Sequence, residues 1–533
     1  MPIPLRVSGM RVGFHFRGEM PSRAGISAAG PGDGLGAGGE QIVVQPGSAL
    51  LESPFRRSMP TDSPAPPGSP ASAAALRKKQ DLALSLRYST CEGIVAVPIV
   101  TMALPASMAI SALITKGFPM STPSIGIMGS LPFVGNFLQI FVSPFLMRWR
   151  APKVVTVASA TLHWASWVAF GIFLPRIPRH SPAQASLWIL GWFFVSSCFG
   201  AVAGVTWSTW IEEWVPARIR GKYFGHRNQV LQFAAVVFLT LSGWILSRWD
   251  YSVGAFQAVV LGSVFLRIFS LRMQWISPTR LYRAPPPEPD SFREQAAVLR
   301  ASGSFLVFVA FGAVWSFAAN CFGPFYFVFM FDKVGFSALD VGIVTALSQI
   351  GGAFSLPAWG RLLDRYGNKP VMVVSLILWQ LPMFLWCVVT PSNRLMLYGL
   401  WTWAGATSAG FVLGQFTFVL RLIPVHAKKM AIGFNLAVSS LVAAVAPVLG
   451  GWALSHAPAG WSSLDAYHAS FVVQPVIALL GAFLLLRVTE PAASPFSTVV
   501  GAMRNIRTLG GVLGLSFLVN YVFVEKASRK DRR

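Results

Sequence analysis

Residues 337–370 read SALDVGIVTALSQIGGAFSLPAWGRLLDRYGNKP, and this stretch carries the pattern that decides the fold. No charged residue lies between Asp340 and Arg361, and a charged loop follows directly. An α-helix needs about 20 mostly apolar residues to cross the hydrocarbon core of a bilayer. Because lipid offers no hydrogen-bond partners, a helix is the form in which one such segment satisfies its own backbone. The stretch therefore predicts a membrane-spanning helix over 341–363 with a charged loop at one end.

Eleven further segments of the chain share this pattern of a long apolar run bounded by polar loops. The composition agrees, since 54% of the residues are hydrophobic and 12% are charged, whereas soluble domains average roughly 25% charged. We predict an all-α membrane protein with twelve transmembrane helices, which argues against a soluble enzyme. With 341–363, the predicted spans are 90–115, 124–147, 152–175, 185–210, 228–247, 254–276, 304–330, 370–390, 395–420, 431–454 and 468–488.

The formal net charge of +23 is interpreted as a topology signal. The Lys and Arg residues lie between the apolar runs, which is typical of membrane loops and argues against a nucleic-acid surface. If the N-terminus is inside, the inner loops hold the larger share, such as Arg148, Arg150, Lys153 and Arg227. The outer loops hold fewer, such as Lys116 and Arg176. The positive-inside rule then predicts that both termini are cytoplasmic.

The longest internal loop divides the spans six and six. It is polar and Pro-rich, and it separates the sixth span from the seventh. The Gly/Pro/Ser-rich start of the chain lacks the apolar residues needed to fold alone, and the end holds a moderately apolar stretch, 496–523, typical of a helix lying on the inner leaflet. The predicted parts are a disordered tail (1–76), an N-terminal half (87–276), a cytoplasmic central loop (277–303), a C-terminal half (304–488) and a cytoplasmic tail with an amphipathic segment (489–533).

The two halves contain an internal repeat. STPSIGIMGSLPFVG (121–135) aligns with SALDVGIVTALSQIG (337–351), and a second block aligns around PARIRGKYFG (216–225) in the same order along the chain. The matched pairs include Ser121 with Ser337, Gly126 with Gly342, Gly135 with Gly351, Lys153 with Lys369, Pro216 with Pro424 and Gly225 with Gly433.

The loop GRLLDRYGNKP (360–370) and the block WIEEWVPARIRGKYFGHRN (210–228) resemble motifs of the major facilitator superfamily. The resemblance covers roughly residues 88 to 490. It implies two pseudo-symmetric six-helix halves around a central cavity that opens alternately to each side. The residues that match the family's loop motif, with an expected role in gating, are Gly360, Asp364, Arg365, Gly367 and Lys369.

The first half departs from the family's loop motif. MRWRAPK (147–153) lacks its Asp and Gly, and Arg148 stands at the position of the acid. In the repeat register Arg148 aligns with Asp364 and Glu213 aligns with Arg421, so the signs are reversed at both positions. We predict two cytoplasmic latches, Arg148 with Glu213 (or Glu212) and Asp364 with Arg421, that stabilise an outward-open state. The alternative, that these are solvated loop charges, stays open.

Polar side chains inside the spans are the candidates for lining a solute path, because such groups are costly in lipid and usually face a cavity or another helix. Glu92 and His163 are candidates for coupling to an ion. Glu92 is also interpreted as an interfacial charge, His163 as a packing residue, and Arg267 as a cation that snorkels to the inner interface. The cavity candidates are Asn136, Gln139, Trp207, Gln232, Asn320, Gln349 and Gln415.

These features favour a secondary transporter of a small solute, a symporter or a facilitator, and not an enzyme. The alternatives are a membrane-embedded sensor or receptor with a transporter fold, and a membrane-integral transferase. We expect a monomer in the plasma membrane, of the bacterial inner-membrane type, with a small solute, a coupling proton or cation and the lipid bilayer as partners, and no nucleic acid. No nucleotide-binding loop or metal-ligand pair is apparent, so neither cofactor nor metal is expected. The substrate is not determined by the sequence.

Overall fold

The computed structural model describes residues 70–104, 106–277, 291–490 and 494–505, together with 508 and 512. By its contacts the chain divides after residue 64, and the first unit lies outside the described residues, as does most of the predicted tail 1–76. Within the described ranges the regular structure is helical. The prediction of an all-α protein is confirmed.

Twelve of these helical segments are long and apolar enough to cross a membrane. The spans agree with those predicted to within a few residues, except at the first. The longer helices are α1 (Pro70–Met102), α3 (Thr122–Trp149), α4 (Pro152–Phe173), α5 (Pro182–Trp214), α6 (Ala217–Arg248), α7 (Val253–Ile276), α9 (Gly303–Cys321), α11 (Ala338–Tyr366), α12 (Asn368–Met383), α13 (Met396–Leu422), α14 (Lys428–Ser455) and α15 (Ser463–Arg487). The shorter α-helices are α2 (Met108–Ala112), α8 (Phe292–Ala301), α10 (Phe325–Asp332) and α16 (Phe496–Met503).

The first span was predicted too late in the chain. Its apolar helix covers Gln80–Met102. Residues 108–117, most of which the prediction included in the first span, form a separate short α-helix followed by a π-turn. The reason is Pro105, which lacks an N–H group and disfavours helical geometry in the residue before it. The helix ends at Met102. Glu92 consequently lies near the middle of its span and not near its start.

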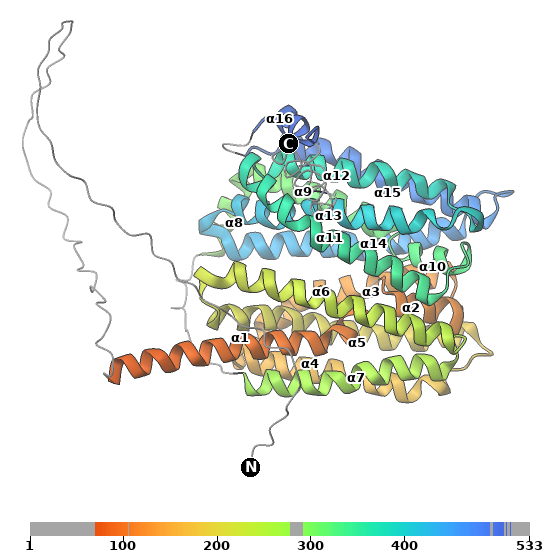
Figure 1. Cartoon of the computed structure of the whole chain (residues 1–533), viewed down its shortest axis with the longest axis horizontal. Coiled ribbons are helices and arrows are strands. Elements are labelled where there is room, and N and C mark those ends of the chain that lie inside the picture. Colours follow the sequence, from red (N-terminus) through yellow and green to blue (C-terminus); the bar gives the residue numbers. More distant parts are fainter. Residues whose placement is uncertain are drawn as a thin grey trace, which may run out of the picture. The chain divides into compact units, whose positions relative to one another are not determined.

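The helices pack in two groups. Within the first group α1 packs on α6 and α7, and α5 packs on α3 and α4. Within the second, α9 packs on α14 and α15, and α13 on α11 and α12. Figure 1 shows α1–α7 gathered on one side and α8–α16 on the other. The most extensive contacts between the groups are those of α3 with α14 and of α6 with α11, and the short helix α2 also contacts α10 and α11.

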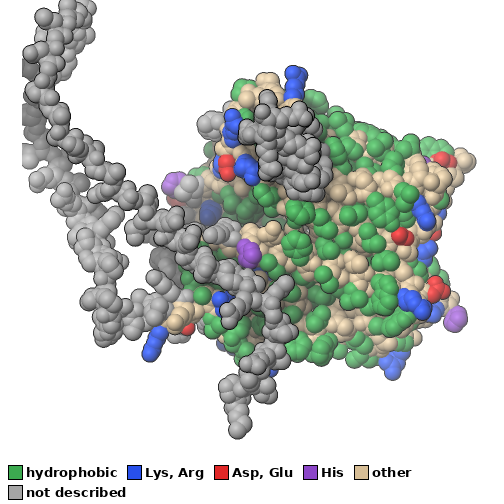
Figure 2. All heavy atoms as spheres, viewed as in Figure 1, with side chains coloured by type: hydrophobic (Ala, Val, Ile, Leu, Met, Phe, Trp, Pro, Cys, Tyr) green, Lys and Arg blue, Asp and Glu red, His purple; other side chains and the backbone are tan. Residues whose placement is uncertain are grey.

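Apolar side chains cover the visible flank of the bundle, and charged side chains gather at its two ends (Figure 2). We call the end at which α7 stops and α9 starts the central-loop face, and the other end the opposite face. An apolar belt between two charged ends is the arrangement that a bilayer requires of a spanning bundle.

The sequence repeat has a counterpart in the packing. Ser121 and Ser337 occupy the N-cap positions of α3 and α11, and the Ser337 side chain accepts a hydrogen bond from the backbone of its helix. A Cβ atom added at Gly126 would lie 2.4 Å from the carbonyl oxygen of Pro447 on α14, and one added at Gly342 would lie 2.7 Å from that of Leu239 on α6. Each of these matched glycines lets its helix approach the opposite half closely.

The second pair of matched glycines does the same within each half. An added Cβ at Gly135 would lie 2.9 Å from the carbonyl oxygen of Ser197 on α5, and one at Gly351 would lie 2.7 Å from that of Thr402 on α13. These contacts are equivalent in the two halves. The alignment of residues 121–135 with 337–351 therefore describes one structural unit used twice.

The halves are joined most closely at the opposite face. One cluster of buried apolar residues there draws on both halves, including Phe118 and Leu246 from the first and Phe331 and Tyr467 from the second. The other apolar clusters among the described residues each belong to a single half. The shared core therefore closes the bundle at this face and not at the central-loop face.

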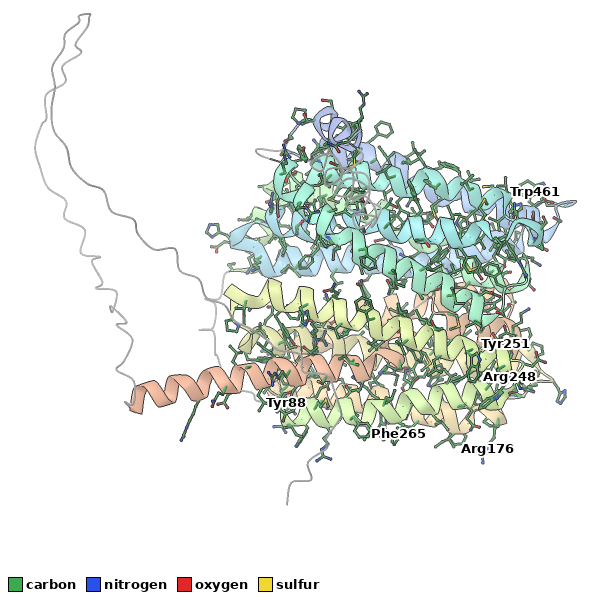
Figure 3. All side chains as sticks on the ribbon, in the orientation of Figure 1. Tyr88, Arg176, Arg248, Tyr251, Phe265 and Trp461 are labelled. Carbon is green, nitrogen blue, oxygen red and sulfur yellow. The ribbon has the colours of Figure 1, made fainter. Side chains whose placement is uncertain are left out.

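Two hydrogen bonds reinforce this closure between α11 and the first half. The backbone N–H of Ala338 donates to the Tyr251 hydroxyl at 2.8 Å, and that of Leu339 donates to Ser247 Oγ at 3.0 Å. Tyr251 lies at the same end of the bundle as Arg176 and Trp461 (Figure 3). Two N–H groups in the first turn of α11, which have no acceptor within their own helix, thus donate to side chains of the first half.

The glycine contacts predict opposite effects for the same substitution at two sites. Gly342→Ala is expected to lower the free energy of unfolding by about 1–3 kcal/mol, because the new methyl group meets a backbone carbonyl that has little freedom to move. Gly433→Ala is the matched control, since an added Cβ there meets nothing within 4 Å. It is expected to raise the free energy of unfolding by about 0.4–1 kcal/mol.

Thermal unfolding of the two purified variants in one detergent provides the measurement. If Gly342→Ala is as stable as Gly433→Ala, the close α6–α11 contact does not exist in the protein.

Candidate functional site

A buried charge cluster lies inside the first half, centred on Glu92 of α1. The residue is 4% exposed. Its carboxylate accepts a hydrogen bond from Gln274 at 2.7 Å and from Ser270 at 3.1 Å, both on α7. It also pairs with Arg227 of α6 and Arg267 of α7, each at 3.4 Å. One carboxylate therefore ties together three helices of this half.

The two arginines of the cluster are as buried as the acid, at 7% exposure for Arg227 and 6% for Arg267. Arg227 donates through Nε to the carbonyl oxygen of Ser89, and its guanidinium lies over the ring of Trp207 at 4.7 Å. Gly93 gives it space, because a Cβ there would lie 2.6 Å from Arg227 Nη2. Such a contact with an indole stabilises a cation most where water is excluded.

The structure corrects two predictions about this cluster. Glu92 is not an interfacial charge, because it lies inside the bundle with four partners. Arg267 does not snorkel, because its Nη1 donates to Ser270 Oγ at 2.7 Å and pairs with Glu92. The physical reason is the same in both cases. A buried charge is stable only when paired, and the folding of α1 against α7 supplies a partner that neither span shows by itself.

Sequence reasoning missed three members of the cluster. Arg227 was counted as a topology charge, and Ser270 and Gln274 received no role. The signal available was local: Glu92 is followed by Gly93, and α7 carries Arg267, Ser270 and Gln274 at helical spacing, which places them along one face. Nothing in the sequence shows that Arg227 reaches the same point.

His163 lies on α4 and is buried. Its Nε2 accepts a hydrogen bond from the indole N–H of Trp167 at 3.0 Å, and Gly200 of α5 lies against its ring. This arrangement agrees with a packing role. The coupling role of His163 stays a prediction.

The seven cavity candidates separate into three groups. Gln139 accepts from Ser143 Oγ, and Asn320 donates to the carbonyl oxygen of Ser316, so both have partners on their own helices. Trp207 forms the second group, because its ring contacts the guanidinium of Arg227. The third group consists of half-buried amides that have no hydrogen-bond partner among the described residues, and its members are Asn136 on α3, Gln232 on α6, Gln349 on α11 and Gln415 on α13.

Unpartnered amides are informative in a spanning helix, because a polar group facing hydrocarbon is costly. Three of the four helices that carry them, α3, α6 and α11, are those that join the halves. Their placement agrees with groups that line a polar path between the halves.

The loop motif of the second half is organised by Glu490, which follows α15 and was not predicted. Its carboxylate accepts the backbone N–H groups of Asn368 at 3.0 Å and Lys369 at 2.7 Å, at the N-terminus of α12. It also pairs with Arg421 of α13 at 3.3 Å. A carboxylate at this position satisfies free N–H groups and complements the helix dipole.

The remaining residues of the loop motif lie near this contact between Glu490 and the N-terminus of α12, or on the helices beside it. Gly367 has φ +93° between α11 and α12, a conformation that favours glycine. Arg365 lies over the ring of Tyr366 at 5.2 Å. Asp364 is exposed and forms no ion pair within the described residues, and Gly360 is in loose contact with Leu413. Arg421 is thus paired with Glu490 and not with the predicted Asp364.

In the first half, a cation joins the start of α4 to the end of α7, the elements equivalent to α12 and α15. Lys153, the repeat partner of Lys369, donates through Nζ to the carbonyl oxygens of Trp275 at 2.8 Å and Ser277 at 2.6 Å. A lysine thus binds the C-terminus of α7, where carbonyl groups lack partners. Arg148 is exposed, and the side chain of Glu213 lies outside the described residues.

The charge cluster predicts a specific order of stabilities. Glu92→Gln is expected to lower the free energy of unfolding by about 3–5 kcal/mol, because both buried guanidiniums lose their anion. Adding Arg227→Gln is expected to recover part of this loss, since one of the two cations is then removed. The measurement is chemical or thermal unfolding of the purified variants.

Glu294→Gln serves as the matched control, because Glu294 is exposed on α8, and it should change stability by no more than about 0.5 kcal/mol. Equal stability of Glu92→Gln and Glu294→Gln would show that Glu92 is not the anion of a buried cluster.

Comparison with known proteins agrees with this architecture. The model of the Major Facilitator Superfamily matches residues 307–524. The chain is 26% identical over 184 residues to the proline/betaine transporter of Salmonella typhimurium, covering 33% of this chain and 34% of that protein. It is 30% identical over 104 residues to the probable chloroplastic anion transporter 2 of Oryza sativa subsp. japonica, covering 20% of this chain and 19% of that one. The chain spans about a third or less of the length of these curated relatives.

Solved structures share the fold over most of the chain. The nucleoside transporter NupG has a TM-score of 0.58 at 15% identity, covering 77% of this chain and 100% of its own. The xylose transporter XylE from E. coli, in a partially occluded inward open conformation, has a TM-score of 0.58 at 12% identity, covering 78% and 100%. The family model matches the second half of the chain, and the twelve spans, the repeated halves and the loop motif are similar to the architecture of the Major Facilitator Superfamily.

Proposed function

We propose that the protein is a secondary transporter that moves a small solute across a membrane by alternating access, and that it is not an enzyme. The observation that carries this proposal is the uneven closure of the halves, because the apolar core that they share within the described residues lies at the opposite face. Two halves joined at one end are one of the two states that alternating access requires. The relatives that share the family are themselves named as transporters.

The orientation follows from charge. The central-loop face carries the larger share of Lys and Arg between the spans, so we assign it and both termini to the cytoplasm. The closed opposite face is then external, and the structure corresponds to an inward-facing state. We expect the protein to act as a monomer in a plasma membrane of the bacterial inner-membrane type.

The solute path is proposed to run between the halves, along the four unpartnered amides of α3, α6, α11 and α13. Amide groups offer both donors and acceptors to a polar solute. Glu92 and His163 remain the candidates for coupling a proton or cation, and Glu92 has the stronger claim because its four partners hold it near mid-span.

The latches are proposed for the outward-facing state. Arg421 would exchange Glu490 for Asp364 as the cytoplasmic ends of the second half close, and Arg148 would pair with Glu213 in the first half. The Arg421 side chain is largely exposed, at 57%, and Glu490, whose side chain is 4% exposed, keeps the two backbone N–H groups at the N-terminus of α12 as donors when the arginine leaves.

The proposal is tested by uptake. Proteoliposomes that contain the purified full chain are incubated with a mixture of neutral, cationic and anionic metabolites, and the internal solutes are identified by mass spectrometry. We expect at least one solute to accumulate above the level in empty liposomes. The control variant Gly433→Ala should behave as the wild type. Failure to take up any solute, with or without an imposed proton or sodium gradient, would contradict transport and favour a sensor.

Closure of the external face is predicted to weaken when its hydrogen-bond acceptors are removed. Tyr251→Phe with Ser247→Ala leaves two N–H groups of α11 without partners, at about 0.5–1.5 kcal/mol each. We expect a larger population of the outward-open state. Spin labels at positions 176 and 461, on exposed residues of different halves, should then show a larger long-distance fraction by electron resonance.

The label pair requires a background without the four native cysteines, and Phe265→Leu on the outer flank is the control.

The same labels test the proposed latch between Asp364 and Arg421. Asp364→Arg should reduce the long-distance fraction, and adding Arg421→Asp should restore it. An unchanged distance distribution in the Tyr251 and Ser247 variant would rule out these bonds as the external closure.

A further inference from the structure

We propose that the cluster around Glu92 is an anion-binding site, and that Arg227 is the residue on which a solute carboxylate, or a similar singly charged planar anion, binds. The solute part of this inference rests on the proposed transport function. The binding part rests on the charges of the cluster alone.

The first argument is the balance of charge. Two guanidiniums share one carboxylate, and Glu92 is the only acid within 4 Å of either among the described residues. All three residues are at least nine-tenths buried. An unpaired charge in such surroundings is strongly unfavourable. A cluster whose only task was to hold α1, α6 and α7 together would be stable with one arginine and one acid. The second arginine therefore calls for a second anion.

The second argument is the loose hold of Glu92 on both cations. Each arginine nitrogen lies 3.4 Å from a carboxylate oxygen, whereas a charge-assisted bond of this kind is typically 2.7–2.9 Å long. Glu92 has its shorter contacts with neutral donors, Gln274 at 2.7 Å and Ser270 at 3.1 Å. The acid is therefore held in place by α7, and neither guanidinium is fully neutralised by it.

The third argument is the supply of unused donors. A guanidinium offers five N–H groups. Arg227 uses Nε and Nη2, and its Nη1 has no hydrogen bond among the described residues. Nε of Arg267, Oγ of Ser89 and Oε1 of Gln274 are buried without a partner. The first two are donors and the third is an acceptor, so with Nη1 of Arg227 the cluster has more unused donors than acceptors, which favours an anion.

The more exposed of the two arginines is Arg227, which lies against Trp207. The Arg227 side chain keeps 9% of its exposure, and it lies on the ring of Trp207, a half-buried residue of α5. Arg267 donates to Ser270 and Glu92 and is buried to a similar degree. A planar carboxylate that approaches over the indole would meet the free edge of Arg227 first, in the two-pronged geometry that arginine favours.

The experiment uses formate, the smallest carboxylate, as the probe and formamide as its neutral match. Thermal unfolding of the purified full chain is followed as each is added at a constant sodium concentration, with sulfate as the balancing anion. We expect formate to raise the unfolding midpoint of the wild type, because a ligand that binds the folded state stabilises it. Formamide should have no such effect. For Arg227→Gln the formate shift should fall to the level seen with formamide.

Two further variants keep the result decisive. Arg227→Lys retains the positive charge but loses the paired N–H donors of the guanidinium and its contact with the indole. At least half of the rise in unfolding midpoint that formate causes should therefore be lost. Arg176→Gln, which removes an exposed arginine at the opposite face, should keep the full shift. If Arg227→Lys or Arg227→Gln responds to formate as the wild type does, the proposed site does not bind anions.

The uptake assay separates this inference from the proposed function. If formate stabilises the wild type through Arg227 and no solute enters the liposomes, the anion site stands and transport fails. If the liposomes accumulate only neutral or cationic solutes, and Arg227→Gln does not change their uptake, transport stands and the anion inference fails. Uptake of an anion that is lost in Arg227→Gln and kept in Arg176→Gln supports both.

Discussion

The constraint on which this structure depends is that lipid offers no hydrogen-bond partner. Each spanning segment must satisfy its own backbone and therefore becomes a helix. Helices in lipid gain little from burying more apolar surface, so they associate where small residues allow close contact. The glycines at 126, 135, 342 and 351 do this at equivalent places in the two halves, against the backbone carbonyl oxygens of neighbouring helices. The pairing of α3 with α14 and of α6 with α11 follows from these contacts.

The same constraint gives polar groups inside the bundle a meaning that they lack in a soluble protein. A buried charge must find a partner, and Glu92 finds four within a single half. Amides that find none, such as Gln232 and Gln349, have to face water or a solute if they are to be tolerated. The structure thus separates the polar residues that brace a half from those that are available to a solute.

The two halves share a repeat but do not share their charges. In the first half Lys153 binds the carbonyl oxygens at the end of α7, and in the second half Glu490 binds the N–H groups at the start of α12. Both contacts complement a helix end, and they join equivalent elements with opposite sign. The ion cluster of Glu92 has no equivalent in the contacts of α9, α14 and α15 among the described residues. Electrostatics therefore makes the halves different while the glycine contacts keep them alike.

The sequence by itself determined the helices and their order. Apolar length fixed eleven of the twelve spans within a few residues, because the thickness of the bilayer sets a length that composition reveals directly. The aligned glycines fixed the repeat. The first span was misplaced because the apolar residues after Pro105 look like a continuation of the helix. Pro105 has no N–H group, and the helix ends before it despite the apolar residues that follow.

Only the tertiary structure decided which charges meet. Glu92, Arg227 and Arg267 lie on three different helices, and Arg421 and Glu490 on two separate parts of the second half. Spacing along one helix predicts which side chains share a face, but it does not predict which other helix that face meets. For this reason Arg227 was interpreted as a loop charge and Asp364 was assigned the partner that Glu490 holds. The physical cause is that pairing in a low-dielectric interior depends on distances of a few ångströms between helices, and those distances are fixed by packing.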